Sequence, residues 1–335
     1  MTNDTFFMLK RLADAPGACA FEDEVVAVAR EYAAHLGTLE EDCLRNLYIH
    51  RKENTGDRPV VMLDAHTDEV GMMIHSIKPN GTLRFLPLGS WNKGSVAGTK
   101  VLVRNRHGEY IPGIVASKPV HFQSAAEKAA GLTELEDMVI DVGAVSAQDA
   151  VENFGVRIGE PVVPAYTTEY DAKRDIIFGK AFDDRIGCAA LLEVLRRLEG
   201  VELPCDVVGV LSTQEELGLR SAKVTVNRVR PAAAVVLEGC PADDTYGSLC
   251  HPDRSEEGSH VPPHGQIPGL QPPVPALRAG PGPGEGPARP GIRPQGRRQQ
   301  RRCRPDRGPG RPRRGGRYPR PLRPRPQLHG HRLRL

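Results

Sequence analysis

Two adjacent carboxylates stand at the entrance of a strongly apolar segment. Asp183 and Asp184 precede residues 185–198, whose apolar spacing predicts a buried helix. Carboxylates in such a place need a counter-charge, and a divalent metal ion provides one, because hard oxygen ligands suit these ions. The alternative is helix capping, since aspartate is favoured in the first turn of a helix. Taken alone, the pair favours capping.

Other potential ligands follow three predicted apolar strands, at 59–66, 206–213 and 232–237. In open α/β sheets, sites lie beyond the carboxyl ends of the strands, so we expect these side chains to converge on one edge. One imidazole with several carboxylates suits Zn²⁺ or a similar ion, and carboxylates shared by two ions give a two-metal site for hydrolysis. The side chains concerned are His66, Glu215, Glu216 and Glu238.

Each group also has an ordinary explanation. His66 could be a core histidine satisfied by Asp68, the two adjacent glutamates could be solvated loop charges, and Glu238 could cap a helix. The four clusters together, each at the end of a strand or the start of a helix, favour the metal site over these separate explanations.

The surrounding elements predict an α/β fold with a mixed, mostly parallel sheet and flanking helices, because strands and helices alternate. Residues 71–164 differ: short β-rich runs broken by Gly and Pro predict a small β-barrel insert, or else an extension of the main sheet. We therefore expect four parts: the first part of a catalytic α/β domain, the barrel, the second part of the catalytic domain, and a basic low-complexity tail. Their bounds are 1–70, 71–164, 165–247 and 248–335.

Composition separates the last part from the others. Residues 251–335 contain 19 Pro, 14 Gly and 19 Arg but no Lys and no Phe, so we expect disorder there. The formal charge is −11 for residues 1–250 and +14 for the tail. Arginine without lysine is also typical of a GC-rich gene read out of frame, so a frameshift between Pro241 and Cys250 is one hypothesis. A nucleic-acid-binding arm is the less favoured alternative, because Tyr318 is its one aromatic residue.

The sequence has seven cysteines without close pairing and no signal peptide, which indicates a cytoplasmic protein with reduced thiols. It has no apolar run long enough to span a membrane, so we expect no membrane partner.

Several motifs resemble the M42 family of metallo-aminopeptidases, of the glutamyl or deblocking type. The similarity covers roughly residues 5–247 and keeps the order of the motifs, which makes it specific. It rests on segments 63–71, 180–187, 213–218 and 237–239, with 113–119 and 140–144 similar to the family's insert domain. The resemblance implies a zinc-peptidase α/β domain, a β-barrel insert, a homo-oligomer that is often a dodecameric cage, and peptide substrates.

It also implies a role for each matching residue. Two divalent ions, zinc or cobalt, would be bound by His66, Asp183, Glu216 and Glu238, with Asp183 as the bridge between them. Glu215 would be the general base, and Asp68 would orient His66. The Asp183–Asp184 peptide would be cis, as in relatives.

The family needs a further histidine for the second ion, and none is found in a matching motif. The closing strands and helices of the family's catalytic domain are also not found after Gly247, so we expect a truncated catalytic domain, an incomplete second site and a chain impaired by the loss of this segment. Alternatives are another metal-dependent amidohydrolase (a carboxypeptidase or deacylase), a glycoside hydrolase using Glu215 and Glu216, or an inactive remnant. The glycosidase is the poorest, because adjacent residues on an extended segment point to opposite faces.

Overall fold

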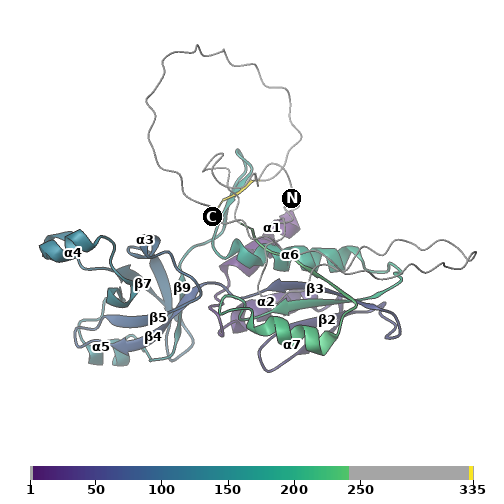
Figure 1. Ribbon diagram of the computed structural model, residues 1–335, viewed down its shortest axis with the longest axis horizontal. Helices are drawn as coiled ribbons and strands as arrows, with labels where there is room; N and C mark the ends of the chain where they lie inside the picture. Colours follow the sequence, from purple (N-terminus) through teal and green to yellow (C-terminus); the bar gives the residue numbers. More distant parts are fainter. Residues whose placement is uncertain (1–2, 241–331, 335) are drawn as a thin grey trace, which may run out of the picture. The chain divides into compact units, whose positions relative to one another are not determined.

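A computed structural model describes residues 3–240 and 332–334, which belong to one unit of the chain. The predictions of a disordered or frameshifted tail lie outside these residues, except for three residues near the C-terminus. Within the described part, the chain forms an α/β sheet with covering helices and a closed β-barrel (Figure 1).

The larger sheet has five strands and is mixed. Its spatial order is β1-β2-β12-β3-β13. The central strand β3 is parallel to β12 and to β13, whereas β2 is antiparallel to both β12 and β1. The strands are β1 (Gly37–Glu41), β2 (Leu47–Arg51), β3 (Val60–His66), β12 (Asp206–Ser212) and β13 (Ala233–Val236). The mixed sheet and the three strands predicted to carry site residues are confirmed, but the sheet is not mostly parallel, because two of its four pairings are antiparallel.

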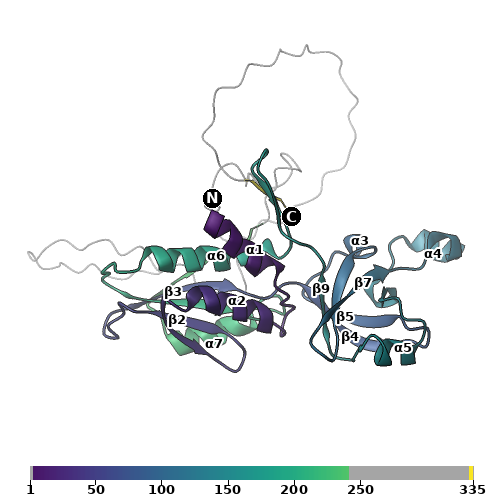
Figure 2. The ribbon, with the colours of Figure 1, turned by 180° about the vertical axis from the view of Figure 1, so that it is seen from behind.

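Helices cover both faces of this sheet. The main core lies under α1 (Asn3–Asp14), α2 (Asp23–Ala33) and α6 (Phe182–Arg197). Figure 2 shows α1 and α6 on one side of the strands. The opposite face of the sheet packs against α7 (Arg220–Val229) through a smaller cluster. Successive residues of the central strands join different clusters, because side chains alternate between the faces of a sheet. In β12, Val207 belongs to the main core and Val208 to the smaller one.

The sequence pattern did not predict helix α7. Its three valines are β-branched and disfavour helix, and two of them, Val224 and Val226, are exposed. The helix instead buries Ser221 and Thr225, which lie four residues apart on one face. A helix that packs through small polar side chains lacks the apolar stripe by which a sequence reveals it.

Between β3 and α6 the chain forms a closed six-stranded barrel, in the order β4-β5-β8-β7-β6-β9. Its strands are β4 (Gly71–Ile77), β5 (Leu83–Leu88), β6 (Lys100–Arg104), β7 (Tyr110–Ala116), β8 (Val139–Asp141) and β9 (Pro161–Pro164). Short helices join them: α3 (Lys93–Val96), α4 (Ala125–Ala130) and α5 (Ala147–Glu152), with 3-10 turns at Val120–Phe122 and Leu135–Asp137. The predicted barrel is found, and the extended main sheet is excluded for this segment.

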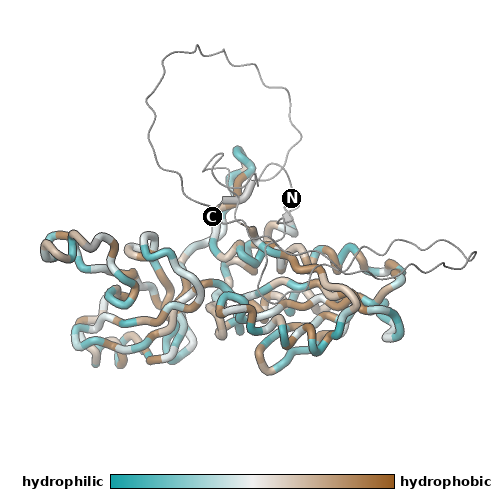
Figure 3. The backbone as a smooth tube through the Cα atoms, in the orientation of Figure 1, coloured by the Kyte–Doolittle hydropathy of each residue, from teal (hydrophilic) through white to brown (hydrophobic). Residues whose placement is uncertain are grey.

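The barrel has its own apolar core, centred on inward-facing residues such as Ile74, Leu83 and Ile140, all fully buried. Figure 3 shows apolar residues along the strands and more polar residues in the connecting loops. A third, three-stranded sheet consists of β10 (Glu169–Asp171), β11 (Ile176–Phe178) and β14 (Arg332–Arg334). The last of these strands is the described part of the basic tail.

Candidate active site

The carboxyl end of β3 is the centre of the site. Because β3 is parallel to β12 and β13, the three strands deliver their following residues to one edge of the sheet. His66, the last residue of β3, is 3% exposed. Its Nε2 lies 2.9 Å from Asp183 Oδ1 and 3.6 Å from Glu238 Oε1. Residues separated by more than one hundred positions in the sequence therefore meet around one imidazole.

These three side chains form a ligand group. The candidate ligand atoms of His66, Asp183 and Glu238 lie within 4.8 Å of one another. Two ligands about 2.1 Å from a tetrahedral ion lie roughly 3.4 Å apart, so the measured separations suit a single ion. An imidazole with two carboxylates is also a suitable donor set for zinc or a similar ion. The residues present therefore fit a divalent metal.

The protonation of His66 agrees with this fit. Burial by itself would lower the pKa of the imidazole, but hydrogen bonds to Asp183 and Asp68 raise it well above its usual value. The carboxylates thus create a place where a positive charge is strongly favoured. A divalent cation would supply such a charge.

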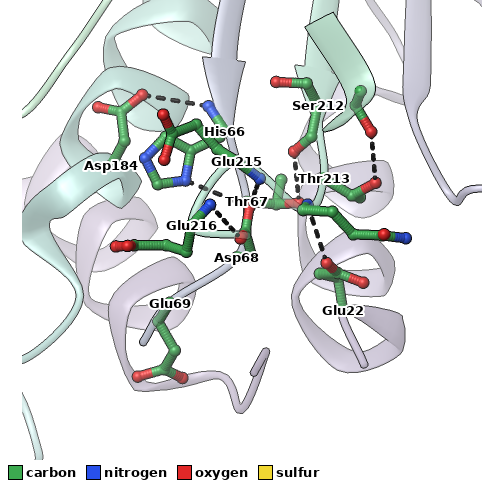
Figure 4. Close-up of polar contacts among 12 residues, drawn as sticks. Glu22, His66, Thr67, Asp68, Glu69, Asp184, Ser212, Thr213, Glu215 and Glu216 are labelled. Atoms are coloured by element: carbon green, nitrogen blue, oxygen red, sulfur yellow. Dashed lines mark hydrogen bonds and ion pairs between the residues drawn. The ribbon is translucent and has the colours of Figure 1, made fainter. Parts of the chain in front are cut away.

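Asp68 connects the histidine to the loop that carries the two glutamates. Its fully buried carboxylate lies 3.3 Å from His66 Nδ1. The same carboxylate accepts the backbone N–H groups of Glu215 and Glu216, each at 3.0 Å (Figure 4). One side chain therefore fixes both the ring of His66 and the backbone of the glutamate pair.

The twin aspartates have different surroundings. The peptide between Asp183 and Asp184 is cis. Asp184 is fully buried and accepts the N–H of His66 at 3.1 Å and that of Gly187 at 3.0 Å, so it acts within the first turn of α6. Asp183 instead faces the imidazole. The capping interpretation thus describes Asp184, and the ligand interpretation describes Asp183.

Burial raises the pKa of several carboxyl groups around the cluster. It raises the pKa of Glu216 to about 7, with the negative charge of Asp183 as the next cause. Burial also raises the pKa of Asp184 to about 8, and it raises the pKa of the half-buried Glu215 above its ordinary value. The carboxylates in this region outnumber the nearby cations. Such an excess of negative charge is expected at a metal-binding site.

Glu216 does not share the compact ligand group. It lines a pocket together with Asp183, so the two carboxylates face a common space. Among residues 3–240, no second histidine joins either group of candidate ligands. The described residues therefore bring together one candidate ligand group that contains a histidine, and Glu216 lies outside it.

Sequence reasoning missed a second buried group behind Asp68. Atoms of Cys19, Glu22 and Asp68 lie within 4.8 Å of one another, and all three residues are buried. One oxygen of Glu22 accepts the N–H of Ala20 at 2.8 Å and that of Gln214 at 3.2 Å. Since Gln214 precedes Glu215, this carboxylate supports the glutamate loop from a segment 192 residues away. Such a partner leaves no signal in the spacing of a sequence.

A sequence profile of the M42 glutamyl aminopeptidase family matches residues 46–261. The glutamyl aminopeptidase of Lactococcus lactis is 32% identical over 273 residues, which cover 80% of this chain and 76% of the relative. The TET aminopeptidase of a marine sediment Thaumarchaeota archaeon has a similar structure, with a TM-score of 0.69 and 38% identity over 73% of this chain and 69% of the other.

The TET1 peptidase of Pyrococcus horikoshii, which can assemble into a tetrahedron or a large octahedral shell, is 26% identical, with a TM-score of 0.62 over 71% of this chain and 70% of that one. No helix in the described part of the chain is long and apolar enough to cross a membrane. The fold, the order of the motifs and the ligand group agree with the sequence comparisons. The chain therefore belongs to the M42 family of glutamyl aminopeptidases, metal-dependent hydrolases of peptide bonds.

Proposed function

We propose that this protein removes N-terminal residues from peptides, with Glu215 as the general base. The observation that carries this proposal is the double role of Asp68. Its carboxylate holds the imidazole of the ligand group and the backbone of Glu215 and Glu216 at once. The proposed base is thereby fixed next to the proposed metal centre, as hydrolysis by an activated water requires.

His66, Asp183 and Glu238 would hold the first divalent ion, zinc or cobalt, and Asp183 with Glu216 would hold a second. When bound, such an ion acidifies water and polarises a peptide carbonyl. The second position lacks an imidazole among the described residues, so we propose that it binds its ion more weakly than the first. This difference would impair the chain relative to its complete relatives.

Glu215 carries the proton transfer in this proposal. Its carboxylate is partly shielded from water, and burial raises its pKa above the ordinary value. A base with a raised pKa accepts a proton from water more readily and still donates it to a leaving amine. Asp68 does not exchange protons here: it holds His66 in one orientation, since its second oxygen is engaged by the loop.

The relatives also support an assembly. TET peptidases form a dodecamer or larger shells, and we propose that this chain likewise forms a homo-oligomer that takes up peptides. The cysteines of the described residues are free thiols, which fits the cytoplasmic setting expected from the sequence.

Aminoacyl-p-nitroanilides test the activity. We expect the purified full chain, supplied with zinc or cobalt, to release nitroaniline from substrates with a free α-amine, and a chelator to stop it. N-acetylated substrates should not react, which separates an aminopeptidase from a deacylase. Release from peptides only at the carboxyl end, or hydrolysis of glucans alone, would refute the proposal in favour of the alternatives.

The role of Glu215 needs its own variant. Glu215→Gln keeps the size of the side chain but removes the base, so kcat should fall by about 10²- to 10⁴-fold. The metal content should stay unchanged, because Glu215 is outside the ligand group. Glu202→Gln, at an exposed glutamate outside every motif and outside the pocket lining, is the matched control and should retain full activity. Loss of metal in Glu215→Gln would show that this residue is a ligand instead.

A further inference from the structure

A pocket of about 720 Å³ opens beside the ligand group. Asp183 and Glu216 lie in its wall. Much of the remaining lining is uncharged and comes from separate parts of the chain, including Val70, Trp91, Ser95, Thr99, Tyr166 and Phe182. The pocket therefore joins three carboxylates, of which that of Glu69 is paired with Lys180, to a wall of aromatic rings, an aliphatic side chain and hydroxyl groups.

Three polar groups of this wall already have partners within the protein. The Trp91 indole N–H donates to the Gly71 carbonyl at 2.8 Å, which leaves the ring as apolar surface. The Ser95 hydroxyl donates to the Asn92 backbone carbonyl at 2.9 Å, and the Thr99 hydroxyl donates to the Ser95 backbone carbonyl at 3.0 Å. The hydroxyl protons of Ser95 and Thr99 are thus used within the protein, which reduces the number of donors that the wall offers a substrate carboxylate.

The cation in the described lining is also engaged. Lys180 Nζ lies 2.5 Å from Glu69 Oε1, and their side chains are 5% and 2% exposed. The buried Arg185 adds a second positive charge, 3.7 Å from the same oxygen of Glu69. Freeing Lys180 for an acidic substrate would break a buried pair, at a cost of several kcal/mol. An acidic substrate side chain therefore finds no free cation in the described lining.

We propose that this pocket receives the side chain of the substrate's N-terminal residue and selects a neutral apolar or aromatic one over an acidic one. This inference rests on the proposed function, which places the N-terminal residue of a peptide at the centre that Asp183 and Glu216 line. The first side chain then extends along the wall formed by Trp91 and Tyr166. Burial of apolar surface there is favourable, whereas an unpaired carboxylate would lie close to two others.

Trp91 allows the selection to be measured without catalysis, because it is the single tryptophan of the sequence. The full chain, treated with a chelator to prevent hydrolysis, is titrated with L-leucinamide and with the α-amide of L-glutamate while Trp91 fluorescence is followed. We expect leucinamide to bind with a Kd lower by about tenfold or more, the discrimination that an apolar pocket provides. Equal or tighter binding of the acidic amide, or no fluorescence change with either, would overturn the proposal.

A charge placed in the wall should change the preference. Ser95 is exposed and lines the pocket, so Ser95→Arg adds a free guanidinium to it. We expect the acidic amide to gain at least about tenfold in relative affinity, since an ion pair then compensates its charge. Ala126→Arg adds the same charge on α4, outside the lining, and should leave the ratio unchanged. A shifted ratio in the control, or none in Ser95→Arg with an unchanged melting temperature, would contradict the assignment.

Nitroanilide assays distinguish this inference from the proposed function. If the fluorescence titration shows selective binding but no substrate is hydrolysed, the proposed aminopeptidase activity is refuted and the proposed selectivity of the pocket stands. If substrates with an N-terminal glutamate are hydrolysed preferentially, the aminopeptidase activity stands and the proposed selectivity of the pocket is refuted.

Discussion

The α/β sheet region and the barrel bury different kinds of side chain. Around the carboxyl end of β3, the chain buries His66, Asp68, Glu69, Lys180 and Asp184. Within residues 71–164, the buried polar or charged residues are Asn105 and Glu160. The barrel is thus an ordinary apolar core, whereas the sheet region carries a concentration of charge at one edge.

The buried charge in each region has a different balance. Glu160 in the barrel is paired with Arg104 at 2.7 Å and also contacts Arg157, and these pairs lower its pKa despite burial. Asp184 and Glu216 at the sheet edge lack such partners, and burial raises the pKa of each. Buried charges that only stabilise the fold are paired with opposite charges. An excess of carboxylates therefore marks the region that serves function.

Removing the central carboxylate should produce the largest effect. Asp68→Ala leaves the N–H groups of Glu215 and Glu216 without their acceptor and His66 without its partner. We expect the free energy of unfolding to fall by about 3–5 kcal/mol and metal affinity by about 10- to 100-fold. Denaturant unfolding and metal titration measure the two. Asp68→Asn keeps one acceptor oxygen, so it should lose less stability and less metal affinity than Asp68→Ala. Equal losses in the two variants would contradict the proposal that Asp68 holds both His66 and the glutamate loop.

The matching change in the barrel should affect stability alone. Ile140, fully buried in β8, contributes to the barrel core and is absent from the pocket lining. Ile140→Ala should lower the free energy of unfolding by about 2–5 kcal/mol while kcat per folded molecule stays the same. Ile140→Val should cost about 0.5–1.5 kcal/mol. A large fall in kcat without unfolding would show that the barrel acts on the chemistry.

Glu22 should make stability depend on pH. Burial raises its pKa to about 7 from the model-peptide value of 4.5. The folded state therefore binds a proton more tightly than the unfolded state, and stability falls as the pH rises from about 4.5 to 7. Glu22→Gln keeps an oxygen for the Ala20 and Gln214 N–H groups and removes this loss.

We expect Glu22→Gln to be more stable than the parent at pH 8, by up to about 3 kcal/mol, and similar to it near pH 4. Urea unfolding across this range measures the difference. Asp23→Asn, at the exposed neighbouring acid, should leave the pH dependence unchanged. A variant that loses stability at pH 8 would show that the ionised carboxylate stabilises the fold.

The smallest effect is expected at the barrel surface. Phe122 is 74% exposed. Phe122→Ser should change the free energy of unfolding by no more than about 0.5 kcal/mol, as is usual for surface positions. Thermal unfolding at several protein concentrations checks this. A larger or concentration-dependent change would show that Phe122 is covered in an assembly.

The sequence predicted most of the elements that carry the site. Continuous apolar runs predict β3 and β12 because strands buried on both faces need apolar residues at every position. The pattern failed for α7, whose buried face is Ser221 and Thr225, since helical periodicity is read from apolar residues. It also gave no indication of Glu22, because nothing local requires a carboxylate there.

What the sequence determined by itself was which residues can do the chemistry and which strand ends deliver them. Parallel strands place their carboxyl ends at one edge whatever their loops do, so the convergence of His66 and Glu238 follows from the strand pattern, and the start of α6 adds Asp183. The tertiary structure alone decided how each group is used. Asp183 faces the imidazole while Asp184 turns into the helix, and Lys180 is engaged by Glu69, because burial and neighbouring charges depend on distances that a sequence does not contain.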